Sequence, residues 1–123
     1  MSGRHGGFLD FLAEVNEQFS HFNVVACKQQ DANPDDLPII EVVADESDNE
    51  ICMIRSASPG NKDAVLKLEV FHQNLRNELE RYPDYSLMVS EWFQIDEEHT
   101  GRLDMPLDSV EIDEDAEVLR LLF

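Results

Sequence analysis

Histidine and cysteine are the residue types of this chain best suited to metal binding or nucleophilic catalysis, and their spacing supports neither. The histidines are His5, His21, His72 and His99. They form none of the Cys-x-x-Cys or His-Glu-x-x-His patterns that zinc sites use. Cys27 and Cys52 each stand in an apolar run, which is typical of reduced core residues. We therefore predict two buried free thiols in strands, no metal site and no cofactor.

Carboxylates are too common in this chain for a pair of them to indicate catalysis. With 27 Asp and Glu residues, close pairs arise by chance. An acid/base pair also needs one carboxyl group whose pKa is raised by an apolar cleft. Only Glu41, Glu69 and Glu91 are isolated among apolar residues, and each is explained as the solvent-facing member of a strand or helix. No nucleophile elbow, phosphate loop or dinucleotide-binding motif occurs, so we assign no catalytic residue and favour a non-enzyme.

One segment has part of the spacing of a calcium loop. Asp31, Asn33 and Asp35 place oxygen atoms at positions 1, 3 and 5 of such a loop. Asp36 replaces the glycine that the sharp turn at position 6 needs, and position 12 is Val42 instead of Glu. The segment therefore predicts weak surface binding of divalent ions at most.

The distribution of acidic residues is the strongest signal in the sequence. The formal net charge is −18, and residues 31–60 and 96–123 together carry −15 of it. Nucleic acids and anionic membranes are bound through Lys and Arg, so we expect direct binding to neither. The expected partner is a basic protein, including proteins that themselves bind nucleic acid.

Within the second acidic segment, carboxylates recur at every second position over residues 111–117. If this stretch is extended, they line one side of a strand at about 6.8 Å spacing, as a DNA-mimicking inhibitor would present to a DNA-binding protein. Solvated loops or a helix N-terminus explain the same residues without a partner. The first acidic segment adds a turn at residues 45–50, and the only Trp is a candidate anchor because Trp is enriched at interface hot spots. The predicted partner-binding residues are Glu111, Asp113, Asp115, Glu117, Asp45, Glu46, Asp48, Glu50 and Trp92.

These observations predict a non-catalytic interaction protein with an acidic face. Its size and charge are similar in type to DNA mimics, immunity proteins against nuclease toxins and anti-defence proteins, but no motif of any of these is present. The alternative is a small-molecule-binding domain or small enzyme with an apolar pocket between sheet and helices. A third alternative is a homodimer built through an exposed sheet edge. No run approaches the roughly 18 apolar residues of a membrane span, and residues 1–7 have no export signal, so we expect a cytoplasmic protein without membrane contact.

Local patterns predict the elements that position these residues. Apolar residues at helical spacing predict helices over residues 7–19 and between the break at residues 58–61 and Pro83. Strand-like runs occupy residues 21–27, 38–44, 51–55, 85–95 and 103–112, with Pro106 indicating a sheet edge or bulge. Residues 64–71 and 113–123 each fit either a helix or a strand.

The expected architecture is a single α+β domain spanning residues 1–123. Two hairpins and a short strand favour an antiparallel β-sheet, with two or three helices packed on one face of it in a two-layer arrangement.

Overall fold

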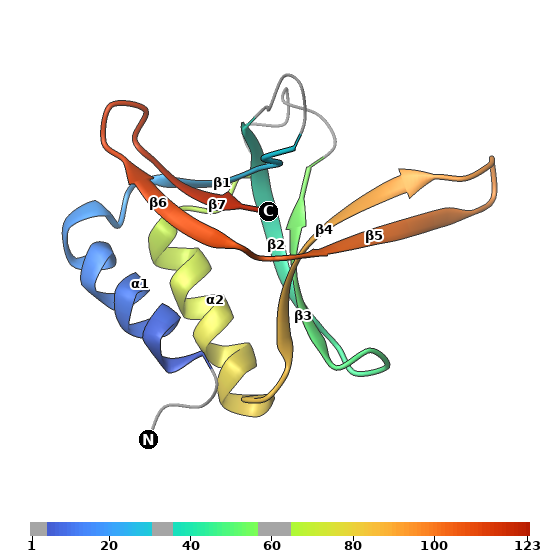
Figure 1. Ribbon diagram of the computed structural model, residues 1–123, viewed down its shortest axis with the longest axis horizontal. Coiled ribbons are helices and arrows are strands. Elements are labelled where there is room, and N and C mark those ends of the chain that lie inside the picture. The colour runs from blue at the N-terminus through green and yellow to red at the C-terminus, as the bar shows by residue number, and fades with distance from the viewer. Residues whose placement is uncertain (1–4, 31–35, 57–64) are drawn as a thin grey trace.

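The computed structural model describes residues 5–30, 36–56 and 65–123, and in these ranges it contains two helices and one seven-stranded sheet (Figure 1). Across the sheet the strands lie in the order β5-β4-β3-β2-β1-β7-β6. The elements in chain order are α1 (Gly6–Phe19), β1 (Asn23–Cys27), β2 (Asp36–Asp45), β3 (Glu50–Arg55), α2 (Leu68–Arg81), β4 (Ser86–Gln94), β5 (Thr100–Pro106), β6 (Ser109–Asp113) and β7 (Val118–Leu122).

Both helices form where the apolar spacing predicts them. The buried face of α2 carries Leu68, Phe71, Leu75 and Leu79, which recur every three or four residues. Residues 65–67 are extended and bond to the backbone of β1 and β2, so the helix begins only at Leu68. The stretch that fitted either state is therefore strand-like in its first half and helical in its second. Neither helix is long and apolar enough to cross a membrane.

The core is built around α2. Its four buried side chains pack with apolar side chains of β1, β2, β3, β4 and β7, and with Leu12 of α1. Phe71 is among the largest side chains that are fully buried. Helix α2 contacts β1 and β2, and α1 contacts α2. The α+β class is confirmed, and the described residues contain two helices, the lower of the two numbers expected.

The prediction of a purely antiparallel sheet is wrong, because β3 pairs with β4 and β1 pairs with β7 in parallel. The chain between β3 and β4 contains α2, and a helical crossover returns a strand in the same direction. The second parallel pair joins strands from opposite ends of the chain, which no local pattern reports.

The predicted return strand over residues 103–112 is two strands on opposite edges of the sheet. It breaks after Pro106, and the next two backbone N–H groups bond to different strands. At the corner, the Leu107 N–H donates to the Leu87 carbonyl of β4 at 3.3 Å. The next N–H, that of Asp108, donates to the Leu122 carbonyl of β7 at 2.9 Å. Two residues thus carry the chain from β5 to β6, and Figure 1 shows the two strands continuing into one another.

The segment over residues 113–123 is a turn followed by β7, and the alternative of a last helix is wrong. Cys52 of β3 is a buried free thiol, as predicted, whereas Cys27 at the end of β1 is free but only half-buried. The loop predicted from Lys28 to Asp36 is only partly described, since residues 31–35, which hold the calcium-like spacing, lie outside the described ranges.

Candidate functional site

Arg102 of β5 is the centre of a charged cluster on the face of the sheet opposite the core. Its guanidinium donates two hydrogen bonds to Asp104, from Nε at 2.8 Å and from Nη2 at 3.0 Å. The same Nη2 pairs with Asp45 of β2 and lies 3.7 Å from Asp48 in the β2–β3 turn. We call Asp45, Asp48, Glu50, Arg102 and Asp104 the Arg102 cluster.

The sheet register explains why these residues meet. Antiparallel pairing of β4 with β5 sets Ser90 opposite Asp104 and Trp92 opposite Arg102, so these four side chains share one face. The Ser90 hydroxyl, which is fully buried, donates to Asp104 at 2.6 Å. Trp92 lies beside the Arg102 guanidinium, which is 5.9 Å from the ring centroid.

Glu50 and Asp104 form a carboxyl pair inside this cluster. Burial raises the pKa of Glu50, and its hydrogen bond to Asp104 raises that pKa further. Burial acts in the same direction on Asp104, but hydrogen bonds from Arg102 and Ser90 outweigh it and hold the pKa of Asp104 below its usual value. When the pair binds one proton, these opposite pKa directions place it on Glu50, which then donates to the Asp104 carboxylate.

The cluster includes a thiol that sequence reasoning treated only as a core residue. Ligand atoms of Glu50, Cys52 and Asp104 lie within 4.8 Å of one another, close enough for one cation to contact all three. Burial raises the pKa of Cys52, so the thiol is protonated and a poor nucleophile. The Asp104 oxygens already accept hydrogen bonds from Arg102, so the positive charge of Arg102 stands where a metal ion would compensate these acids. The arrangement can hold and exchange a proton, and we assign it no catalytic step.

The β4–β5 hairpin presents exposed apolar side chains on both of its faces, and we call them together the hairpin patch. Figure 1 shows this hairpin extending away from the rest of the molecule. Trp92 and Phe93 are each 50% exposed, Ile95 is 62% exposed and Leu103 is 43% exposed. Large apolar side chains at this exposure are otherwise represented only by Val70 among the residues that the structure describes. A concentration of them on one projecting element is a mark of an interaction site.

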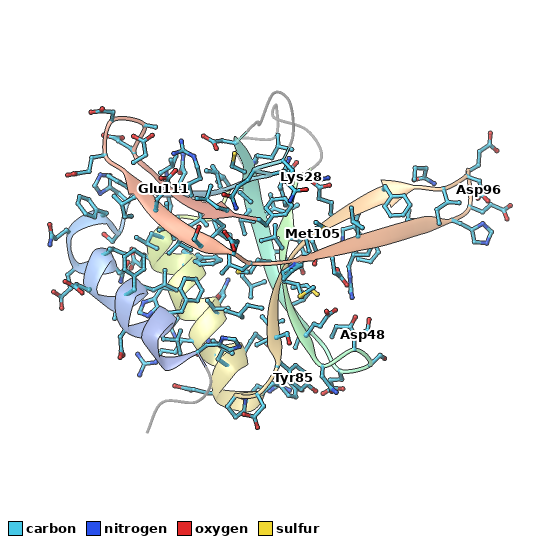
Figure 2. The ribbon with its side chains drawn as sticks, in the orientation of Figure 1. Lys28, Asp48, Tyr85, Asp96, Met105 and Glu111 are labelled. Carbon is cyan, nitrogen blue, oxygen red and sulfur yellow. The ribbon has the colours of Figure 1, made fainter. Side chains whose placement is uncertain are left out.

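The tip of the hairpin is acidic and ordered by its own hydrogen bonds. Oδ1 of Asp96 accepts the backbone N–H groups of Glu98 and His99 at 2.8 and 2.9 Å. These bonds, together with the His99 ring 2.8 Å away, lower the pKa of Asp96. Figure 2 shows Asp96 at the far end of the hairpin, so negative charge from Asp96, Glu97 and Glu98 borders the hairpin patch.

The acidic row predicted over residues 111–117 is only half extended. Glu111 and Asp113 lie on β6, whereas Asp115 and Glu117 lie in the turn before β7, where Glu117 has a φ of 57°. Arg120 of β7 donates to Glu111 at 2.9 Å and to Asp113 at 3.2 Å. Arg120 also pairs with Asp36 at 2.7 Å, so two of the four carboxylates of the row share one positive charge with a third acid.

The structure brings some of the predicted partner-binding residues together and separates others. Asp45, Asp48 and Glu50 gather with Trp92 around Arg102, and Glu46 accepts a hydrogen bond from Tyr82 beside them. Figure 2 shows Asp48 and Glu111 on opposite sides of the molecule, so the two acidic groups do not form one continuous face. Phe93, Ile95 and Leu103 were missed, although the alternating run around the only Trp is a signal that could have indicated them.

A separate cavity lies where the N-terminus of α1 meets β4 and the corner between β5 and β6. Its volume is about 380 Å³, and its lining includes His5, Phe8, Met88 and Asp108. His5 lies 2.7 Å from the Tyr85 carbonyl through Nε2. Trp92 does not line this cavity.

No protein-family model, no curated protein and no solved structure significantly matches this chain.

Proposed function

We propose that this chain is a cytoplasmic, non-catalytic interaction protein that binds a basic protein partner through the β4–β5 hairpin and the neighbouring Arg102 cluster. The partner is of the kind that binds nucleic acid, and occupation of its nucleic-acid site inhibits it, as an immunity or anti-defence protein would. The observation that carries the proposal is the hairpin patch, an exposed apolar surface bordered by carboxylates.

The two components of this surface have different roles in binding. Apolar and aromatic side chains supply affinity, because their burial removes water from the interface core. The surrounding carboxylates supply fast, salt-sensitive association with a cationic surface. An acidic chain with a net charge of −18 favours a partner of opposite charge at every stage of approach.

Two variants with opposite expectations test the proposal. Phe93→Ser combined with Ile95→Ser removes two of the four side chains of the hairpin patch, at the exposed end of the hairpin. The matched control replaces Glu111, Asp113, Asp115 and Glu117 with their amides at the other acidic end. Each variant and the wild type is used as bait in a cell extract at 50 and 500 mM salt, captured proteins are identified, and the main one is purified for titration.

We expect a basic protein whose affinity falls at least tenfold with the hairpin variant and at high salt, while the four-amide control retains it. Retention by the hairpin variant together with loss from the four-amide variant would instead place binding at the β6–β7 turn. Capture that is equal for all baits at both salt concentrations would refute an acidic docking surface altogether.

The cavity beside α1 supports a second candidate, a small-molecule-binding domain. His5 and Asp108 in a partly apolar lining of Phe8 and Met88 could orient a polar group of a ligand. A metabolite library screened for an increase in melting temperature tests it, with Met88→Trp as the variant that fills the cavity. Ligands that stabilise the wild type but not the filled variant would establish this function, and no stabilising ligand would remove it.

A further inference from the structure

Strand β5 is an edge of the sheet. Two hydrogen bonds, one beyond each end of its ladder with β4, show which β5 residues bond to β4 and which do not. Beyond one end, the Ile95 N–H donates to the His99 carbonyl at 3.0 Å. Beyond the other, the Leu107 N–H donates to the Leu87 carbonyl at 3.3 Å. Because hydrogen-bonded pairs alternate along an antiparallel ladder, Gly101, Leu103 and Met105 are the β5 residues whose backbone groups point to β4.

The backbone groups of the alternate residues therefore point away from the sheet. These are the N–H groups of Thr100, Arg102 and Asp104 and the carbonyls of the same residues and of Pro106. Pro106 falls on this outer side, where its missing N–H costs no ladder bond. No other strand among the described residues pairs with β5 on this side. A row of unpaired donors and acceptors of this kind is a template for another strand.

The core-facing side of this edge is apolar. A Cβ added to Gly101 would lie 2.6 Å from Cζ of Phe93, so the Phe93 ring lies across the glycine. Leu103 and Met105 follow on the same face of β5. The ring of Phe93 thus takes the place of the missing side chain, and with Leu103 and Met105 it offers an added strand a continuous apolar row. On the other face the edge offers polar Thr100 and the Arg102–Asp104 pair.

Charge decides which strand fits this edge. A second copy would bring another −18 to the interface, including a second acidic hairpin tip. Residues 96–98 are all acidic, and on the polar face of the hairpin the Arg102 cluster holds four carboxyl groups around one guanidinium. An extended segment with basic residues alternating with apolar ones satisfies both the apolar row and the carboxylates.

We propose that β5 accepts an extended, alternating basic and apolar segment of the partner as an added strand. This inference rests on the proposed function and specifies its binding mode. Backbone hydrogen bonds from Thr100, Arg102 and Asp104 give the added strand its direction, and the row of Phe93, Leu103 and Met105 selects its apolar side chains.

The test uses a labelled ten-residue peptide of alternating Lys and Val, because N-methylation can block either of its two edges without changing its charge. If Val faces the apolar row in an antiparallel arrangement, the Lys N–H groups point to β5 and the Val N–H groups point to solvent. Methylating three Lys nitrogens should then weaken binding about 100-fold, from the loss of three hydrogen bonds, whereas methylating three Val nitrogens should leave it within threefold. The reverse pattern would support addition of a parallel strand.

Thr100→Pro supplies the matched test on the protein, since it removes a donor from the free edge without breaking the ladder to β4. We expect about tenfold weaker binding than for Thr100→Ala, with unchanged circular dichroism. Strand addition is refuted if both methylated peptides bind like the unmodified one, if both lose binding, or if the unmodified peptide does not bind.

These outcomes are separable from failure of the proposed function, which is decided by the captured partner and the hairpin variant. Concentration-dependent dimerisation of the wild type, abolished by Thr100→Pro, would overturn the proposed partner and assign this edge to a second copy.

Discussion

Replacing Arg102 with Met should lower the free energy of unfolding by an amount between the cost of breaking a surface ion pair and that of breaking a buried one. Arg102 is 18% exposed, and its partners Asp45 and Asp104 are each 17% exposed. Breaking an exposed ion pair costs up to about 1 kcal/mol and breaking a buried one about 3–5 kcal/mol. The intermediate exposure and the two hydrogen bonds to Asp104 give about 2 kcal/mol for Arg102→Met at pH 7.

The destabilisation caused by Arg102→Met should be smaller in acid, because the pKa values of both Asp partners are lowered in the folded state. The hydrogen bond from Arg102 holds the pKa of Asp45 below its usual value, and bonds from Arg102 and Ser90 do so for Asp104. The stability from these lowered pKa values is present above the unfolded-state values and is lost as the pH falls through the folded-state values. Both folded-state values lie below the usual aspartate value, so at pH 2.5 we expect Arg102→Met to cost less than half of its value at pH 7.

Urea unfolding measures both quantities, with circular dichroism for the whole fold and fluorescence of Trp92, which lies beside Arg102. Arg102→Lys is the matched control, because it keeps the charge but loses the two-pronged contact with Asp104, and should cost about 1 kcal/mol. A cost below 0.5 kcal/mol for Arg102→Met at pH 7, or an equal cost at both pH values, would show that the Arg102 cluster does not contribute as described.

Three further predictions follow from the core and the carboxyl pair. Phe71→Ala should cost about 3–5 kcal/mol in urea unfolding, because Phe71 is fully buried on α2, while Val70→Ala at an exposed position should cost less than about 0.5 kcal/mol; similar costs for the two would contradict the assigned core face. Cys27 should react with a thiol reagent in the native protein much faster than Cys52, since only Cys52 is fully buried, and equal rates would contradict this difference. Glu50→Gln should flatten the pH dependence of stability above the usual glutamate pKa, because the raised pKa of Glu50 gives the wild type stability at low pH that is lost as the pH rises through that pKa; urea midpoints that follow the same pH dependence in the variant and the wild type would refute the raised pKa of Glu50.

The elements that local pattern predicted are those whose partners are close in sequence. The helix over residues 7–19 and the hairpin of β2 and β3 depend on apolar periodicity and on one acidic turn, all of which the sequence shows directly. The parallel pairs could not be predicted this way. Alternation within β1 is compatible with several neighbours, and the choice of β7 depends on how the whole sheet closes over α2.

The prediction made from Pro106 was correct about a sheet edge but did not include the break into two strands. The missing N–H of Pro106 correctly indicated a sheet edge, and β5 is one. The sequence over residues 103–112 nevertheless reads as one strand, since the residues on both sides of the corner remain strand-like. Only the hydrogen bonds of Leu107 and Asp108 to different strands reveal the change of edge.

The acidic residues of the candidate site were predicted from the sequence, but Arg102, the base that pairs with them, was not. Counting carboxylates identified both acidic segments, but their spacing did not indicate which charges are free. Arg102 and Arg120 are the two bases of residues 96–123, and each organises a group of acids from several strands. A lone Arg within a strongly acidic stretch is therefore a signal of an internal ion-pair centre.

The pairing of β1 with β7 also has a consequence for how the chain folds. This contact joins strands near opposite ends of the chain, so its formation must close a loop that contains most of the sequence. Proteins dominated by such distant contacts fold slowly, and β1 stays unpaired on one side until β7 has been synthesised. During synthesis, the free edge of β1, which carries the apolar residues Val24, Val25 and Ala26, therefore stays open to pairing with another chain until β7 completes the sheet.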